Sequence, residues 1–272
     1  MNEPNAARRL HSQELAHYAE AGYCVRPQVF SAQQVTELRA AVGAATKRAQ
    51  QLATQGKTYW LDGKRFIDTQ HWTLQFEHQK GSEQLRVIEP VHDLDPSLER
   101  LVDDPRLVQP MQQLIGSEQL ALWTAKLNLK SARTGSGFGW HQDSPYWVHD
   151  HSEVDDLPNV FVALDDADET NGCLSVIRGS HLAGCLPGRS DGEQLSGFFT
   201  DPNCFDLNAA VPLVMAAGSV AFFSPHIVHG SAINSSDAAR RALIYTYQAG
   251  QGPALKSGVS RPVRMRVGMG QR

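Results

Sequence analysis

The chain has 272 residues, of which 41% are hydrophobic and 20% charged, and its formal net charge is −4. This composition excludes collagenous, low-complexity and highly charged disordered chains. The slight acidity disfavours a nucleic-acid binder, which usually carries a basic face. The longest apolar stretch, residues 213–223, is well short of the ~20 residues that a membrane helix needs. We therefore expect no nucleic-acid partner and no membrane partner.

The cysteines and the N-terminus suggest a compartment. None of the four cysteines lies in a C-x-x-C pair, so zinc-ribbon and thioredoxin-like motifs are absent from the sequence. The first ten residues lack the apolar segment of a signal peptide, so we expect a cytoplasmic protein with reduced thiols. Eleven histidines are a rich supply of the commonest metal ligand.

The first ~115 residues are predicted to be mainly helical, with a short strand at residues 23–26. Residues 55–90 have mixed polarity and give no clear assignment. The first helix is expected to end at Gly22 and the last at Gly116. Capping residues and prolines mark the helix starts at Ser12, at Ser31 with Gln34, at Asp95–Pro96 and at Asp104–Pro105.

After Gly116 the pattern changes to short strands separated by turn residues. This pattern, with no helix between the strands, favours an antiparallel barrel or jelly roll. Alternation predicts that Leu120, Leu122, Thr124, Lys126 and Asn128 share one face of a strand. Residues 184–210 lack periodicity, and such a long loop in a compact domain is typical of a lid. The expected strands are residues 120–129, 160–164, 174–177, 219–223 and 242–247.

Two short segments carry candidate metal ligands. In Trp140-His141-Gln142-Asp143, alternate residues of a strand share a face, so His141 and Asp143 are able to bind one ion. A distant histidine, His229 or its rival His226, completes a 2-His-1-carboxylate triad, which leaves coordination positions open on Fe(II). His226 and His229 are three residues apart and point to opposite sides of an extended strand.

An arginine follows the second segment at a suggestive distance. Arg240 lies eleven residues after His229, and an arginine near such a site suits bidentate capture of a carboxylate. The adjacent Arg241 is expected to point the opposite way.

The order of these motifs resembles the phytanoyl-CoA dioxygenase family, a branch of the Fe(II)/2-oxoglutarate oxygenases that includes ectoine hydroxylases. The shared pattern is H-x-D, then a distant H-G-S-x-x-N, then arginine eleven residues after that histidine. Further motifs agree in the same order: residues 22–25 (GYCV), 137–143 (GFGWHQD), 171–174 (NGCL), 179–181 (GSH) and 218–220 (GSV).

The resemblance implies a mainly β protein with flanking helices: a double-stranded β-helix (jelly roll, cupin-like) with N-terminal helices packed outside. It implies one domain over residues 1–272, with a helical part at about 10–116 and a jelly-roll core at about 117–250. The implied metal ligands are His141, Asp143 and His229. The implied 2-oxoglutarate contacts are Arg240, Ser231, Asn128 and Phe138. The halogenases related to this family have a small residue where this chain has Asp143, so the carboxylate argues for hydroxylation or desaturation.

The implied reaction uses Fe(II), 2-oxoglutarate and O₂, hydroxylates an unactivated C–H bond of a small molecule, and releases succinate and CO₂. The sequence does not choose among natural-product, amino-acid-like and acyl substrates, nor between monomer and dimer. Trp147, close to the metal motif, is our predicted substrate contact. From the N-terminal half, Arg86 and Trp72 are expected at the mouth of the pocket, together with Arg65, His71 and Phe76.

Two alternative functions stay open. A non-catalytic jelly-roll protein that binds a small molecule has the same fold, because fold alone does not determine function. A zinc-dependent hydrolase also uses such a triad, but it has no need of Arg240. Arg178 stands where the family has proline; its side chain either lies on the surface or reaches a substrate anion, and we expect it on the surface.

Overall fold

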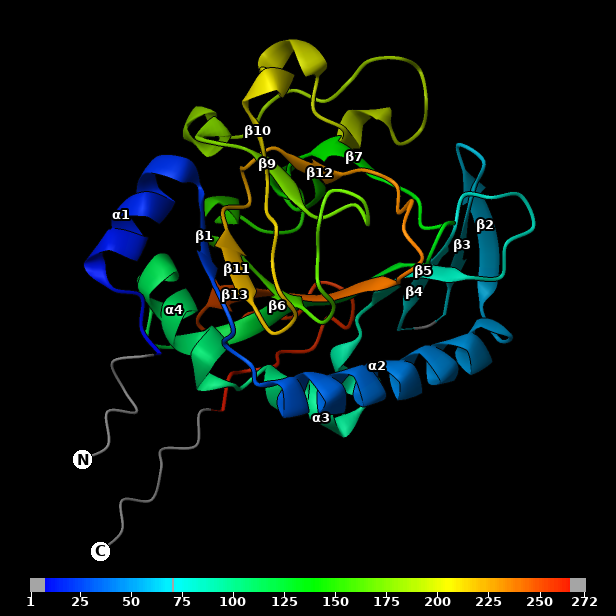
Figure 1. Cartoon of the computed structure of the whole chain (residues 1–272), viewed down its shortest axis with the longest axis horizontal. Coiled ribbons are helices and arrows are strands. Elements are labelled where there is room, and N and C mark those ends of the chain that lie inside the picture. Colours follow the sequence, from blue (N-terminus) through cyan, green and yellow to red (C-terminus); the bar gives the residue numbers. More distant parts are fainter. Residues whose placement is uncertain (1–7, 70, 265–272) are drawn as a thin grey trace, which may run out of the picture.

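The computed structural model describes residues 8–69 and 71–264. In these ranges no helix combines the length and the apolar character needed to span a bilayer. Two antiparallel sheets form the double-stranded β-helix, or jelly roll, with helices outside it (Figure 1). The helices are α1 (Ser12–Ala21), α2 (Ala32–Ala53), α3 (Pro96–Leu101) and α4 (Pro105–Ile115).

The larger sheet has nine strands within the described ranges and the smaller has four. In spatial order the larger sheet contains β1 (Tyr23–Arg26), β11 (Val220–Phe223), β8 (Asn159–Ala163), β13 (Arg240–Ala249), β6 (Leu120–Lys130), β5 (Leu85–Glu89), β4 (Thr73–Phe76), β3 (Lys64–Asp68) and β2 (Lys57–Leu61). The smaller contains β10 (Ala210–Pro212), β9 (Ser175–Ile177), β12 (His229–Ser231) and β7 (Phe138–His141).

Local capping explains where the helices start and end. At α2 the Ser31 hydroxyl accepts from the Gln34 amide and the Gln34 side chain accepts from the Ser31 amide, which confirms the capping box. Both Asp-Pro starts are confirmed as well. At α1 the cap is His11, one residue before the expected Ser12. Glycines end α1 and α4 as expected, with φ 84° at Gly22 and 73° at Gly116.

The N-terminal part is less helical than expected, because residues 57–89 form four strands, β2 to β5, that extend the larger sheet. The β2–β3 hairpin turns at Asp62 and Gly63, which both have positive φ (47° and 72°). An Asp-Gly pair between two runs of strand formers is a strong hairpin signal. The mixed polarity of these strands hid it, since β2 is the outermost strand and largely exposed.

One strand does not alternate as expected. β6 carries a bulge opposite Thr246 and Tyr247, where pairing moves from Thr124 to Leu122. The extra residue reverses the facing of the side chains that follow it. Leu122 therefore packs in the same core as Leu127, whereas Lys126 faces the space between the two sheets. For this reason the prediction that alternate residues from Leu120 to Asn128 all share one face of the strand is wrong.

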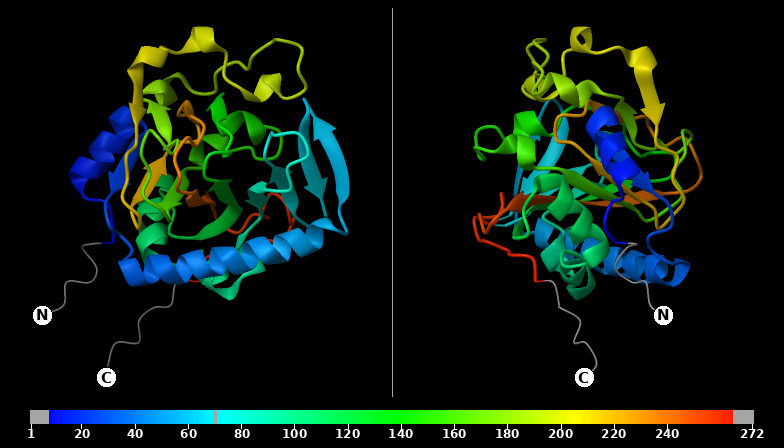
Figure 2. Two further views of the ribbon diagram at one scale, coloured as in Figure 1. Left: turned by 45° about the vertical axis from the view of Figure 1, so that its right-hand side comes forward. Right: turned by 90° about the vertical axis from the view of Figure 1, so that its left-hand side faces the viewer.

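Two cores hold the layers together. α2 and α3 pack beneath the larger sheet, and the predicted face of α2 (Val35, Leu38, Val42 and Ala45) is buried there (Figure 1). A second core fills part of the space between the sheets, with side chains such as Phe161 and Val176. The remainder of that space is open, and residues 184–210 run across the top of the barrel above it (Figure 2).

We predict that replacing Ile88 of β5 with alanine lowers the free energy of unfolding by about 2–5 kcal/mol, because its fully buried side chain leaves a cavity. The matched control is Ile233→Ala, at a side chain that is 64% exposed. Urea unfolding followed by circular dichroism measures both variants. One cooperative transition with a lower midpoint for Ile88→Ala is expected if residues 57–89 belong to the barrel domain, and two separate transitions would contradict this.

Candidate active site

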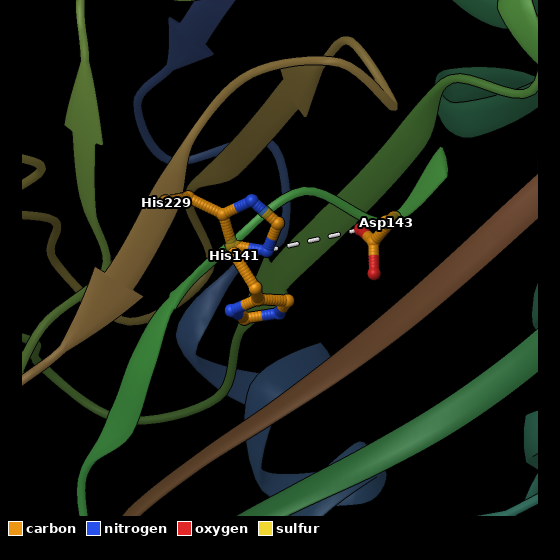
Figure 3. A group of neighbouring side chains, drawn as sticks. All are labelled: His141, Asp143 and His229. Atoms are coloured by element: carbon orange, nitrogen blue, oxygen red, sulfur yellow. Dashed lines mark ion pairs between the residues drawn. The ribbon is translucent and has the colours of Figure 1, made fainter. Parts of the chain in front are cut away.

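Three potential metal ligands converge between the sheets (Figure 3). The small-sheet strands β7 and β12 pair so that His141 lies directly opposite His229. Asp143 follows β7 by two residues and turns back toward the two rings. One nitrogen or oxygen from each of these three residues lies within 4.8 Å of the others. The ring centroids of the two histidines are 4.2 Å apart, and His229 Nε2 is 3.8 Å from Asp143 Oδ2.

The backbone orients both imidazole rings. His141 Nδ1 lies 2.7 Å from the Gly139 carbonyl oxygen, and His229 Nδ1 lies 2.9 Å from the Ile227 carbonyl oxygen. A ring that donates from Nδ1 leaves the Nε2 lone pair free for a metal. Burial, together with repulsion from His229, lowers the pKa of His141 to about 3, so that its ring is neutral at neutral pH. The donors therefore fit a divalent metal.

Asp143 is held as a carboxylate. Asn159 Nδ2 donates to its Oδ2 at 2.9 Å, and Lys126 Nζ lies 3.8 Å from its Oδ1. Burial alone would raise the pKa of Asp143, but Lys126 and the two histidines outweigh burial and lower it. The aspartate is thus charged without a metal, and two described neighbours fix its orientation.

The rival histidine points elsewhere, as expected from the spacing. His226 Nδ1 is 2.8 Å from Ser144 Oγ, and its Nε2 is 2.7 Å from Asp155 Oδ1. His226 thus supports the turn after β7. Gln142, between the two ligands of that turn, is fully buried. Its Nε2 donates to the Gly184 and His226 carbonyls at 2.8 and 2.5 Å, and its Oε1 accepts from the Leu186 amide at 2.7 Å.

A cavity of about 720 Å³ extends from the three ligands. All four predicted 2-oxoglutarate contacts line it: Arg240, Ser231, Asn128 and Phe138. Arg240 is 2% exposed, and its Nη2 donates to the Gly172 carbonyl at 2.7 Å, but its Nε has no partner among the described residues. Arg241 points the other way and binds Asp165. A buried, incompletely bonded guanidinium in the cavity suits an anionic ligand.

The structure corrects two of the three predicted substrate contacts. Trp147 is 1% exposed and packs against Trp123 and Leu157, because the turn at 144–146 directs it away from the cavity. Trp72 packs against the outer core and donates from Nε1 to Asp93. Arg86 does line the cavity, as predicted.

The other candidates for the mouth lie elsewhere. Arg65 pairs with Glu83, His71 contacts Asp93, and Phe76 is buried. Arg178 forms a surface ion pair with Glu20, as expected.

Sequence reasoning did not select several of the residues that line the cavity. Tyr146, the neighbour of Trp147, lines the cavity and stacks on Phe198 of the 184–210 segment, with ring centroids 4.5 Å apart. Lys126 and Glu89 also line it. The signal for these two was available, since each is a charged residue in a strand of mainly apolar residues.

The 184–210 segment covers one side of the cavity, which supports the expectation of a lid. Leu195, Phe198 and Phe199 are among its lining residues. The tip of the β2–β3 hairpin holds this segment, because the Asp62 carboxylate accepts from the amides of Gln194 and Leu195 at 2.8 and 2.7 Å.

Comparison with known proteins places this site in a family. The model of the phytanoyl-CoA dioxygenase family matches residues 18–242, which include all three potential ligands and Arg240. The chain belongs to the phytanoyl-CoA dioxygenase family. Within this family member, Gly172 of the N-G-C-L motif has a structural task, since a Cβ there would lie 2.3 Å from the Ala232 carbonyl oxygen. Only glycine fits at that position, where its own carbonyl supports Arg240.

Curated relatives are similar over much of the chain. An L-proline trans-4-hydroxylase from Streptomyces griseoviridis is 32% identical over 186 residues, covering 62% of this chain and 69% of the relative. An ectoine dioxygenase from Bordetella bronchiseptica is 33% identical over 189 residues, covering 63% of this chain and 59% of the relative. The crystal structure of EctD from S. alaskensis with 2-oxoglutarate and 5-hydroxyectoine shares the fold: TM-score 0.69, 24% identity, 92% of this chain and 79% of that chain.

We predict that His229→Ala weakens Fe(II) binding more than about 100-fold, since loss of supporting residues alone commonly costs about 10–100-fold in metal affinity. His226→Ala is the matched control and should change the affinity by only a few-fold, because its ring contacts Ser144 and Asp155. Anaerobic equilibrium dialysis of purified, metal-depleted protein measures both. If His226→Ala lost Fe(II) binding while His229→Ala kept it, the third ligand would be His226 and not His229.

Proposed function

We propose that the protein is an Fe(II)- and 2-oxoglutarate-dependent dioxygenase that hydroxylates an unactivated C–H bond of a small molecule, with succinate and CO₂ as co-products. The observation that carries this proposal is the shared cavity of a 2-His-1-carboxylate triad and a buried arginine with an unpartnered Nε. The names of the curated relatives, a proline hydroxylase and ectoine dioxygenases, support it.

The three ligands, His141, Asp143 and His229, would hold iron between the two sheets. His141 and His229 would bind through Nε2, since each Nδ1 is engaged by a carbonyl. Asp143 would bind through a carboxylate oxygen while Asn159 keeps its orientation. When bound, Fe(II) supplies the redox chemistry that couples oxidation of 2-oxoglutarate by O₂ to C–H hydroxylation. The residues themselves position the groups and leave one side of the metal site open to the cavity.

Buried positive charge would attract the 2-oxoglutarate dianion. Arg240 and Lys130 are cross-strand neighbours on β13 and β6, and both are almost fully buried. Burial, with repulsion from Arg240 and Arg86, lowers the pKa of Lys130 to about 7. Such mutual repulsion is relieved when a carboxylate binds Arg240. We infer that Ser231, Asn128 and Phe138 complete the 2-oxoglutarate site, since all line the same cavity.

The primary substrate would occupy the part of the cavity beneath the lid. Aromatic side chains from β3, the turn after β7 and the lid form its walls, among them Phe66, Tyr146 and Phe198. Closing these side chains over a substrate would exclude water from the reacting atoms. We further propose a cytoplasmic location and no nucleic-acid partner. The four free cysteines, two of them exposed, agree with a reducing compartment.

We predict that anaerobic addition of Fe(II) and 2-oxoglutarate gives the weak visible charge-transfer band of their chelate. Arg240→Ala should raise the dissociation constant of 2-oxoglutarate by about 10–100-fold, the usual worth of a charged hydrogen-bonded pair, and leave Fe(II) affinity within a few-fold. Arg241→Ala is the control, because it faces Asp165. A wild-type protein that shows neither the band nor 2-oxoglutarate binding would refute the dioxygenase proposal.

A further inference from the structure

Two opposite charges lie side by side in the cavity, outside the groups assigned to iron and 2-oxoglutarate. β5 and β6 are antiparallel, with Val87 opposite Asn128 and Ile88 opposite Leu127. Continuing this register by one residue brings Glu89 opposite Lys126. Both line the cavity. Side chains that face each other across antiparallel strands have Cβ atoms about 4.5–5.5 Å apart, so their charged ends share one region of the cavity.

Each side chain is steadied by a neighbour. The Lys126 ammonium lies 5.3 Å from the centre of the Trp147 ring, and its side chain is 21% exposed. The Thr124 hydroxyl donates to Glu89 Oε1. The Lys126 ammonium thus lies between two carboxylates, those of Glu89 and Asp143, with its nitrogen 3.8 Å from Asp143 Oδ1. Trp147 does not line the cavity, but its ring thus lies under the Lys126 ammonium and helps to position it.

The ion pair of Lys126 with Asp143 is long, at 3.8 Å, and binding of Fe(II) to Asp143 would weaken it further. Under the proposed function, the negative charge of Asp143 is shared with Fe(II). Lys126 then faces the cavity with a smaller counter-charge from Asp143. A partly buried cation beside a buried carboxylate favours a ligand that satisfies both, because either charge left unpaired is costly.

We propose that Lys126 and Glu89 select the primary substrate as a zwitterionic amino or imino acid, with its carboxylate on Lys126 and its ammonium on Glu89. This proposal rests on the proposed function. A cation alone would accept any anion, whereas the adjacent Glu89 disfavours substrates that carry only negative charge. Because Lys126 lies next to Asp143, the anchored groups sit close to the metal. The hydroxylated carbon therefore belongs to the amino acid's own skeleton rather than to the far end of a long acyl chain.

The experiment compares matched ligands and matched variants. Wild-type protein loaded anaerobically with Fe(II) and 2-oxoglutarate is titrated by calorimetry with the twenty common α-amino acids. Those that bind are then compared with their carboxamides and N-acetyl derivatives. We expect at least one amino acid to bind, and both of its derivatives to bind about tenfold or more weakly, as a charged hydrogen bond is lost.

Two substitutions separate the two charges. Lys126→Met keeps the length of the side chain and should lower affinity for the amino acid by about 10–100-fold, with recovery in Lys126→Arg. Glu89→Gln should weaken binding of the amino acid while leaving that of its N-acetyl derivative nearly unchanged. Lys47→Met, at an exposed position on α2, is the matched control and should bind as wild type does.

The outcomes distinguish the substrate proposal from the dioxygenase proposal on which it rests. Absence of the charge-transfer band in wild-type protein would defeat the dioxygenase proposal itself. If the band forms but no amino acid binds, or if the carboxamides bind as well as the acids, the substrate proposal is overturned. The ligand comparison uses wild-type protein, so it stays decisive even if Lys126→Met fails to fold.

Discussion

The pairing of β7 with β12 is the constraint on which the site depends. It sets His141 opposite His229, and carbonyls of the same two segments turn both rings so that Nε2 faces inward. A slip of one residue in this register would turn one of the two histidines to the opposite face, away from the other. The small sheet thus does more than cover the core, because its hydrogen-bond ladder determines the geometry of the proposed metal centre. The larger sheet supplies the charged groups that surround it.

Most of those charged groups are buried, and a buried charge is costly unless it is paired. Arg240 has an unpartnered Nε among the described residues, and beside it stands Lys130, whose pKa is lowered to about 7 by burial and by the neighbouring guanidinium groups. Asp143 is negative before any metal binds. The protein alone leaves these charges imperfectly balanced. Iron at the triad and a dianion at Arg240 would balance both ends, so binding and folding stability are coupled through the same residues.

Sequence reasoning reached the features that depend on short spacing. The H-x-D segment, the H-G-S segment and the arginine after it all contribute side chains to one cavity, as predicted. This could be predicted because strand alternation and the spacing within the family motifs can be recognised in short stretches of sequence. Helix ends were predictable for the same reason, down to the Ser31–Gln34 box. What failed depended on longer-range geometry. The bulge in β6 reversed the expected face of Leu122, and the tight turn after β7 exchanged Trp147 for its neighbour Tyr146.

The buried amide of Gln142 links the metal-ligand segments to the loop that covers the cavity. Its side chain bonds to the segment before His229 and, on its other side, to residues 184 and 186 at the base of the lid. The peptide between two potential ligands is therefore tied directly to the element that covers the cavity. A displacement of residues 184 and 186 would therefore act directly on the segment that carries His141 and Asp143, through two hydrogen bonds of one buried side chain.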